Sequence, residues 1–428
     1  MRTVLLGICG LGKAQLAGRI DSWCQTHHHH APLRIEDFEH NYLPNGAKVP
    51  YRTFLRDAPT KQFDYWRSGW AELRGSGFLG STNDDTVLLM HGAIVRGDYG
   101  TRVVLDLPSV LEFQPDTIIT LIDDVYDLWW RTEDRAKDDS WKGRPTLEQL
   151  IAARRTEQLV GDLIANHLNP PARHVVLSVN HPLENAARLI LSTSPPHIVY
   201  LAFPISEPRR MLQQQPPNQR GMDLINEFHR SAFQIQKELP NCLFITPLAI
   251  DERPLSDLAR QPESGVVEEV AAAQGEPDQQ CLRFDRDTRR WPTTIVGPRE
   301  TLISAGPPNA SAQKPIPLSQ VRAASGSIET DVGWRDYRLV LQADALAVCC
   351  PVMNNRDELA GGVRDEINFA TTRGKPVYIY QDEQQDEKNL ARQLLKPGSS
   401  AMGVSDQQEL ITFCQSMEDA LKRAAGAD

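Results

Sequence analysis

The chain has 428 residues, of which 40% are hydrophobic and 24% charged, and a formal net charge of −10. This length exceeds what one hydrophobic core usually serves, so it predicts two domains. The negative charge argues against a general affinity for duplex nucleic acid, because lysine and arginine supply most non-specific phosphate binding. The chain has neither an apolar run of the roughly 18 residues that a membrane span needs nor a signal-peptide pattern, so we expect a cytoplasmic protein without a membrane partner.

Two residue types bear on metals and redox state. The seven cysteines form neither CxxC pairs nor a disulfide framework, which fits a reducing compartment, and we interpret them as buried thiols. The four consecutive histidines from His27 to His30 can bind a metal, but adjacent side chains do not converge on one ion. A solvated loop is the better interpretation.

The first half of the chain alternates short aliphatic runs with longer amphipathic stretches, which is typical of α/β folds with parallel strands. We predict strands at Thr3–Leu6, Thr86–Met90, Thr117–Ile122 and His174–Val179, and helices at Lys13–Trp23 and Thr146–His167.

A second alternating block follows the proline-rich boundary Ser194-Pro195-Pro196. Its predicted strands are His197–Ala202, Cys242–Ile245, Ala345–Cys350 and Pro376–Tyr380, and its predicted helices are Met222–Glu238, Trp334–Gln342, Val363–Thr372 and Gln407–Ala424. Gly, Pro, Ser, Gln and Glu dominate residues 251–330, which we interpret as a partly flexible insertion with a hairpin at Cys281–Thr294. The sequence therefore predicts two parallel-sheet α/β domains, 1–193 and 194–428.

A glycine-rich segment follows the first predicted strand. Gly7, Gly10, Gly12 and Lys13 belong to Gly7-Ile-Cys-Gly-Leu-Gly-Lys13, which has the GxxxxGK form of a P-loop and opens a predicted helix. The glycines let backbone N–H groups turn toward phosphate oxygens, and Lys13 adds a positive charge. The segment predicts a site for ATP or another NTP with Mg²⁺. Ala14 replaces the usual Mg²⁺-binding Ser or Thr, which leaves phosphoryl transfer open.

The first half resembles adenylate kinase-like enzymes, which also carry a small residue without a hydroxyl at the Ala14 position, and the resemblance implies a P-loop NTPase fold. His91-Gly92 follows a strand where that family usually has Asp-Gly. Asp123 ends another strand, where a carboxylate can hold Mg²⁺ through water. Arginines that resemble the phosphoryl-clamping lid are Arg131, Arg135, Arg144, Arg154 and Arg155. The alternative is that Asp123 and Asp124 cap the next helix and the arginines form a solvated face.

Three segments of the second half carry a further pattern: His197–Ser206, Trp334–Val348 and Gly361–Val377. The last contains Gly-Val-x-x-Glu-Ile-x-x-Ala followed by Gly-Lys-Pro-Val. In this order they resemble the nucleoside 2-deoxyribosyltransferase superfamily, most closely its branch of 2'-deoxynucleoside 5'-monophosphate N-hydrolases. The resemblance implies a flavodoxin-like sheet and a homo-oligomer.

Breaking a C1'–N bond passes through an oxocarbenium-like state that a carboxylate can attack or stabilise, and Glu366 is the candidate. It lies in the first turn of a predicted helix, where Gly362 allows the backbone to approach a ribose. The resemblance offers Asp336, with Tyr200 beside it, as the acid that helps the base leave, and Asp344 as a pocket-ordering or sugar-binding residue. The alternatives are a dipole-stabilised Glu366, an exposed Asp336 and a core Tyr200.

The site for the substrate's phosphate follows the first strand of the second domain. Ser206, Arg209 and Arg210 stand where the hydrolase branch has a glycine-rich turn, and arginine can bind phosphate by a bidentate fork. Ala360 replaces a serine of that branch, which leaves a larger nucleotide such as NAD or ATP open as the substrate. No cofactor is expected for the glycosidase step.

The leading hypothesis is a nucleotide N-glycosidase whose NTP-binding domain phosphorylates or senses nucleotide. Salvage, nucleotide-pool depletion or antiviral defence would suit such a pairing. Two alternatives remain: a nucleoside or nucleotide kinase with a non-catalytic ligand-binding domain, and a nucleotide sensor without enzymatic activity.

Overall fold

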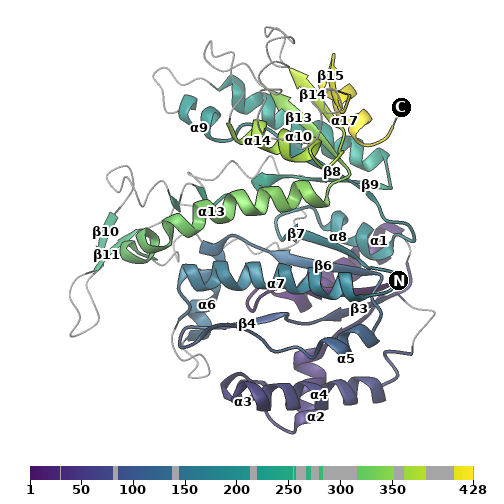
Figure 1. The fold of residues 1–428 in the computed structure, drawn as a ribbon, viewed down its shortest axis with the longest axis vertical. Coiled ribbons are helices and arrows are strands. Elements are labelled where there is room, and N and C mark those ends of the chain that lie inside the picture. Colours follow the sequence, from purple (N-terminus) through teal and green to yellow (C-terminus); the bar gives the residue numbers. More distant parts are fainter. Residues whose placement is uncertain are drawn as a thin grey trace. The chain divides into compact units, whose positions relative to one another are not determined.

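The computed structural model describes residues 1–28, 30–80, 85–136, 144–212, 219–253, 255–256, 267–270, 279–282, 316–350, 361–381 and 409–427. These residues form an α/β protein with two five-stranded parallel sheets flanked by helices, as the sequence predicts (Figure 1). Unit 1 contains the described residues of Met1–Thr193, Ala249–Pro292 and Arg299–Val332, and unit 2 those of Ser194–Leu248 and Gly333–Asp428.

The sheet of unit 1 has the strand order β2-β3-β1-β6-β7. Its strands are β1 (Arg2–Leu6), β2 (Arg34–Asp37), β3 (Thr86–Leu89), β6 (Thr117–Ile122) and β7 (Arg173–Ser178), and all of them pair in parallel. The central strands β3 and β6 are buried along their whole length, and β1 from Thr3 onwards, which explains why they read as continuous apolar runs. A separate antiparallel pair joins β4 (Ala93–Arg96) and β5 (Gly100–Val103).

The helices of unit 1 are α1 (Lys13–His28), a π-helical turn η1 (Phe38–Tyr42), α2 (Leu43–Ala47), α3 (Tyr51–Arg56), α4 (Pro59–Gly75), α5 (Leu107–Glu112), α6 (Val125–Ala136), α7 (Leu147–His167) and α8 (Leu183–Leu191). The long helix α7 lies against β6 and β7, and α1 contacts α8. Thr146 begins α7 with a capping box, because its hydroxyl accepts from Gln149 N while the Gln149 amide oxygen accepts from Thr146 N.

The sheet of unit 2 has the order β15-β14-β13-β8-β9, again all parallel. Its strands are β8 (His197–Ala202), β9 (Cys242–Ile245), β13 (Ala345–Cys350), β14 (Val377–Gln381) and β15 (Ile411–Cys414). Counted within the sheet, this order is 2-1-3-4-5, the order of flavodoxin-like doubly wound sheets. In such sheets ligands bind outside the carboxyl ends of the strands at the switch point, which here lies between β8 and β13.

Unit 2 contains the helices α9 (Ser206–Leu212), α10 (Arg220–Glu238), α14 (Gly361–Thr371) and α17 (Met417–Ala424). It also contains most of a 3-10 turn, η2 (Pro247–Ala249), and the part of α13 (Leu318–Gln342) from Gly333 onwards. Helix α14 contacts β13 and β14, while α10 and α17 contact each other. His229 on α10 is fully buried, with its Nδ1 2.9 Å from the Ile225 carbonyl and its Nε2 2.8 Å from the Thr246 hydroxyl. Burial lowers the pKa of His229 to about 4.

Three predictions of secondary structure need correction. The helix predicted at Gln407–Ala424 is wrong in its first part, because Ile411–Cys414 forms β15 and Ser416 caps the shorter helix α17. Ile, Thr and Phe favour a strand that can pair with β14. Helix α13 begins at Leu318, before the predicted start at Trp334, and α1 continues through His28, so His27 and His28 do not lie in a loop.

The segment 251–330, expected as an insertion of the second domain, is described only in part. Three short antiparallel strands lie in or beside it: β10 (Val267–Val270), β11 (Gln279–Leu282) and β12 (Ile316–Pro317). Of the hairpin predicted at Cys281–Thr294, only Cys281 and Leu282 are described, and the rest lies outside the described residues. The described residues of 249–332 belong to unit 1, although the sequence places them in the second domain.

Candidate functional sites

Unit 1 carries a glycine-rich turn between β1 and α1. Gly10 and Gly12 have φ angles of 100° and 69°, a region that residues with side chains rarely adopt. A Cβ atom on Gly7 would lie 2.7 Å from Leu11 Cδ1 and 3.2 Å from the Leu121 carbonyl oxygen. The turn therefore requires glycine at these positions, as a phosphate-binding loop does.

Lys13 is the first residue of α1 and is 7% exposed. Its Nζ donates to the Gly7 carbonyl at 2.5 Å, so the ammonium group lies across the loop. The N-terminus of α1 adds a partial positive charge at the same place. This arrangement of loop, helix start and ammonium group fits the phosphates of a nucleotide.

Two buried acids that the sequence did not single out bind the backbone of residues 91–93, and one of them, Glu157, interacts electrostatically with Lys13. Glu39 accepts from His91 N at 2.6 Å and lies 3.3 Å from His91 Nδ1. Glu157 accepts from the backbone N–H groups of Gly92 and Ala93 at 2.8 and 3.1 Å. Burial raises the pKa of Glu157 above its ordinary value, although Lys13 lowers it. Glu39 is in η1, His91 follows β3 and Glu157 is in α7, so no local sequence motif indicates that these residues lie together.

The structure places Asp123 in a protein network. Its carboxylate is fully buried, lies 2.6 Å from Arg131 Nη1 and accepts from Asp124 N at 2.8 Å. The Asp124 carboxylate accepts from Tyr126 N at 2.8 Å, so it caps α6. Asp124 therefore caps α6, as the structural alternative predicts. The Asp123 carboxylate, which was predicted to hold Mg²⁺, pairs with Arg131 and accepts from Asp124 N, and these contacts compete with metal binding. Among the described residues, no group of three His, Cys, Asp or Glu side chains is arranged to hold a metal.

The arginines expected to form a lid also make structural contacts. Arg131 pairs with Asp123, and Arg144 lies over the Trp129 ring, 3.1 Å from its centroid, while donating to the Trp129 carbonyl at 3.0 Å. Arg154 is 1% exposed and is therefore not part of a solvated face. These contacts lie within unit 1, and the cofactor-binding role of Arg131 and Arg144 stays a prediction. The Arg135 side chain lies outside the described residues.

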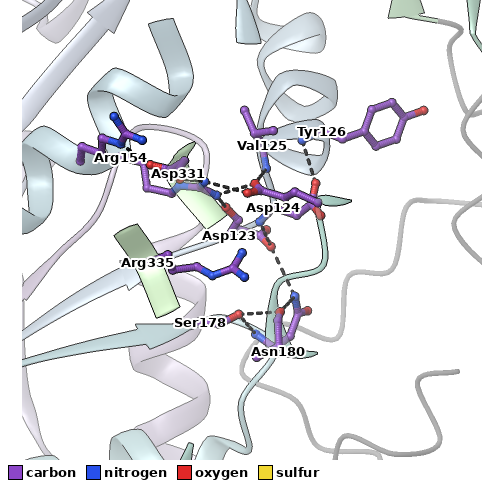
Figure 2. Close-up of polar contacts among 12 residues, drawn as sticks. Asp123, Asp124, Val125, Tyr126, Arg154, Ser178, Asn180, Asp331 and Arg335 are labelled. Carbon is purple, nitrogen blue, oxygen red and sulfur yellow. Dashed lines mark hydrogen bonds and ion pairs between the residues drawn. The ribbon is translucent and has the colours of Figure 1, made fainter. Parts of the chain in front are cut away.

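Arg154 is the centre of a buried ionic network (Figure 2). It donates to both carboxylate oxygens of Glu252, at 2.6 and 2.9 Å, and to the Asp123 carbonyl at 2.6 Å. It also pairs with Asp331, which Arg155 contacts from the same helix. Burial raises the pKa of Asp331, but the two arginines outweigh this effect and hold it below its ordinary value. The network joins α7 to the residues of 249–256 and to the first part of α13.

Unit 2 brings Tyr200 and Glu366 together at the switch point of its sheet. Tyr200 is on β8, and Glu366 is on α14, the helix that follows β13. The Tyr200 hydroxyl donates to Glu366 Oε1 at 2.8 Å. Tyr200 is fully buried and Glu366 is 8% exposed. Tyr200 is a core residue whose hydroxyl has a buried polar partner, and Glu366 is in the second turn of α14, so it is not in the first turn that the dipole alternative requires.

The electrostatics of this pair come from burial and from a second carboxylate. Burial raises the pKa of Glu366 well above its ordinary value, and the negative charge of Asp336 raises it further. The Tyr200 hydrogen bond opposes this shift. Burial and the nearby Glu366 also raise the pKa of Tyr200, so the phenol stays neutral. A carboxyl group with a raised pKa next to a second acid is a common arrangement for acid–base catalysis.

Asp336 is held by its neighbour on α13. Arg335 donates from Nε and Nη2 to Asp336 Oδ1, at 3.1 and 2.9 Å. The Arg335 side chain is 4% exposed and that of Asp336 is 17% exposed, so the exposed-residue alternative for Asp336 is wrong. The sequence did not single out Arg335. Its position next to the predicted acid was visible, but helical neighbours do not ordinarily face each other.

Asp344 does not join this site. Its carboxylate accepts from Ile198 N at 2.7 Å, at the amino ends of β8 and β13 and therefore at the opposite edge of the sheet. The predicted pocket role of Asp344 is corrected to a structural one, in which it fixes the start of the parallel ladder. Ser206 is exposed at the start of α9, which follows the carboxyl end of β8. The Arg209 side chain lies outside the described residues.

Gly362 is exposed in the first turn of α14. A Cβ atom there would meet no atom of the described residues within 4 Å, so the described fold does not itself require glycine at this position. The approach of a ribose at this position stays a prediction.

Neither protein-family models nor curated proteins match this chain. The candidate sites therefore depend on their geometry and on the sequence motifs that predicted them. No helix in the described parts of the chain is both long and apolar enough to cross a membrane.

Proposed function

We propose that unit 2 is a nucleotide N-glycosidase, which hydrolyses or transfers the N-glycosidic bond of a nucleoside or nucleotide, and that unit 1 binds an NTP. The observation that supports the proposal most is the buried Tyr200–Glu366 pair with Asp336 close by, at the switch point of a parallel sheet. The sequence motif around Glu366 supports the same chemistry.

The reaction needs two functions that a carboxyl pair supplies. One acid protonates the leaving base, and a carboxylate stabilises or attacks the cationic sugar carbon. Tyr200 orients Glu366 through its hydrogen bond, while Arg335 orients Asp336. Ser206 and Arg209 are proposed to bind a substrate phosphate, since the helix that contains them follows β8.

Unit 1 is proposed to bind ATP or another NTP with Mg²⁺ through Gly7, Gly10, Gly12 and Lys13. The turn geometry and the ammonium group across it support this binding. Mg²⁺ on a nucleotide takes most of its ligands from phosphate and water, so few protein groups are needed. The nucleotide serves either as a phosphoryl donor or as a signal.

The wider setting is proposed on the same basis. We place the protein in the cytoplasm as a homo-oligomer acting on small nucleotides, in salvage, nucleotide-pool depletion or antiviral defence. The oligomer follows from the superfamily resemblance, and size-exclusion chromatography with light scattering tests it.

Chromatographic detection of free base tests the proposal. Wild type and Glu366→Gln are incubated with nucleosides, dNMPs, NTPs and NAD, with and without ATP and Mg²⁺. Release of base by wild type alone is expected. An ATP requirement for that release would assign a controlling role to unit 1, whereas no release from any substrate would contradict the proposal.

A kinase is the second candidate, favoured by the buried acid Glu157, which interacts electrostatically with Lys13. It predicts ATP consumption that survives Glu366→Gln and is lost in Lys13→Met. Loss of all turnover in Glu366→Gln would exclude it as the main activity. If the protein binds nucleotide but neither releases base nor consumes ATP, a sensor remains.

A further inference from the structure

The phosphate loop of unit 1 contains a cysteine to which the proposed function assigns no role. Cys9 lies between Gly7 and Gly10 and carries an unoxidised thiol. Its Sγ lies 4.0 Å from the Tyr51 hydroxyl, and its side chain forms a hydrogen bond with His91. A nucleophilic atom therefore lies in the loop, next to an ionisable ring.

His91 lies between this thiol and a carboxylate. Glu39 accepts from His91 N, and its Oε1 lies 3.3 Å from His91 Nδ1. Burial and Lys13 lower the pKa of His91, but Cys9 and Glu39 outweigh them and raise it to about 10, so the ring is an imidazolium at neutral pH. His91 is 8% exposed, and its Nδ1 makes no hydrogen bond to the described residues. The three side chains thus form a series of nucleophile, proton carrier and orienting carboxylate, with one buried N–H available to a bound group.

A second cysteine of the same unit shows what burial does to a thiol without such partners. Cys24, on α1, is 0% exposed and Cys9 is 2% exposed, so the two thiols are buried alike. Burial and the nearby Asp21 and Asp85 carboxylates raise the pKa of Cys24 to about 12. Cys9 instead has an imidazolium beside it and lies just before the N-terminus of α1, and such surroundings make a cysteine reactive. The two thiols therefore differ in their partners and not in their burial.

We propose that Cys9 is a modification site, which a hydroperoxide oxidises to a sulfenic acid with His91 as the proton donor, and that the oxidised loop no longer holds NTP phosphates. The second part rests on the NTP binding proposed for unit 1. A loop that admits phosphate groups also admits hydrogen peroxide, which is smaller. Because Cys9 is buried, the added oxygen displaces atoms of the loop.

The oxidation consumes the Cys9 thiolate, one hydroperoxide and one proton. The sulfur lone pair attacks a peroxide oxygen, so an S–O bond forms while the O–O bond breaks. Sulfur is oxidised by two electrons, and the second oxygen of hydrogen peroxide leaves as hydroxide, which takes the His91 proton and becomes water. A small thiol reverses the change, because it displaces water from the sulfenic acid to form a mixed disulfide, and a second thiol then releases Cys9.

Peptide mass spectrometry tests the modification, with Cys24 as the matched control. The reduced full-length protein is treated with hydrogen peroxide in the presence of dimedone, which traps sulfenic acids. Cys9 should be labelled about 100-fold or more faster than Cys24, because the thiolate is the reactive form. Saturating ATP should slow the labelling of Cys9 and leave that of Cys24 unchanged. Equal labelling of the two cysteines, or no label on Cys9, would overturn the proposal.

The role of His91 is tested by the same labelling in His91→Gln. Loss of the proton donor should slow the labelling of Cys9 by about 10-fold or more, while Cys24 stays unlabelled. A variant that failed to fold would expose Cys24 to the label, so misfolding is recognised in the same experiment, and the comparison in wild type then decides. Undiminished labelling of Cys9 in a folded variant would remove His91 from the reaction.

The effect on nucleotide binding is measured by isothermal titration with ATP before and after peroxide treatment. Oxidation should weaken ATP binding by wild type about 10-fold or more, and dithiothreitol should restore it. Cys9→Ala should bind ATP with the same affinity before and after treatment. Equal weakening in wild type and Cys9→Ala would assign the effect to another residue and overturn the proposal. If reduced wild type binds no ATP, the NTP binding proposed for unit 1 fails, whereas the dimedone label still decides whether Cys9 is modified.

Discussion

Replacing Arg154 by Met should be one of the most destabilising single changes in unit 1. Met keeps much of the volume but removes the guanidinium between Glu252 and Asp331, both 1% exposed. Removing one partner of a buried ion pair leaves uncompensated charge and costs about 3–5 kcal/mol. For a domain of this size each kcal/mol lowers Tm by about 2–4 °C, so the expected decrease is about 6–20 °C.

Thermal unfolding followed by calorimetry measures this change, with Arg155→Met as the matched control. Arg155 is adjacent on α7 and also pairs with Asp331, but its side chain is 31% exposed, so its loss should cost about 1 kcal/mol or less. The pH dependence adds a second signature. The pKa of Asp331 is lowered in the folded state, so the stability from its pairing is present above the unfolded pKa of about 4 and disappears as pH falls. Equal melting temperatures for the two variants would refute the assignment of Arg154 as the centre of the network.

Three further predictions follow from the described residues. Lys13→Met should weaken NTP binding, measured by isothermal titration, by about 10-fold or more, since a charge-assisted phosphate contact is worth about 1.5–3 kcal/mol; unchanged affinity would contradict the phosphate site. Gly362→Ala should raise KM for base release without lowering Tm, because a Cβ atom there meets no atom of the described residues; a lower Tm would show a structural need for this glycine. His229 has a folded pKa of about 4, below the unfolded value of about 6.5, so its contribution to stability is complete above pH 6.5 and is lost as pH falls toward 4, by about 3 kcal/mol. Denaturant unfolding of wild type and His229→Gln from pH 7 to 4 measures it, and parallel pH dependences would refute it.

The buried strands were the most predictable part of the fold. Thr117–Ile122, His197–Ala202, Cys242–Ile245 and Ala345–Cys350 have the bounds that the sequence predicts. Each is a short aliphatic run that a parallel sheet buries on both faces, so local composition alone marks it. Tyr200 and Glu366 were predictable for a different reason, because each lies inside a motif with a fixed place in the chain.

What the sequence did not reveal depends on pairing across the chain. Glu252 and Asp331 lie 98 and 177 residues from Arg154, and no local pattern marks such partners. The first part of α13 is rich in Gly, Ser and Ala, which gives a weak helical pattern, and it was therefore interpreted as part of the insertion. Asp344 was misassigned because its motif fixed its place in the sequence but not the edge of the sheet that its carboxylate faces.

The most direct test of the central claim is the rate of free-base release by wild type beside Glu366→Gln, with a nucleotide panel and high-resolution chromatography. We expect release by wild type and a loss of about 100-fold or more in the variant, while both proteins bind NTP equally through unit 1. Equal release by the two proteins, or none by wild type, would contradict the account that Glu366 carries out N-glycosidic bond cleavage.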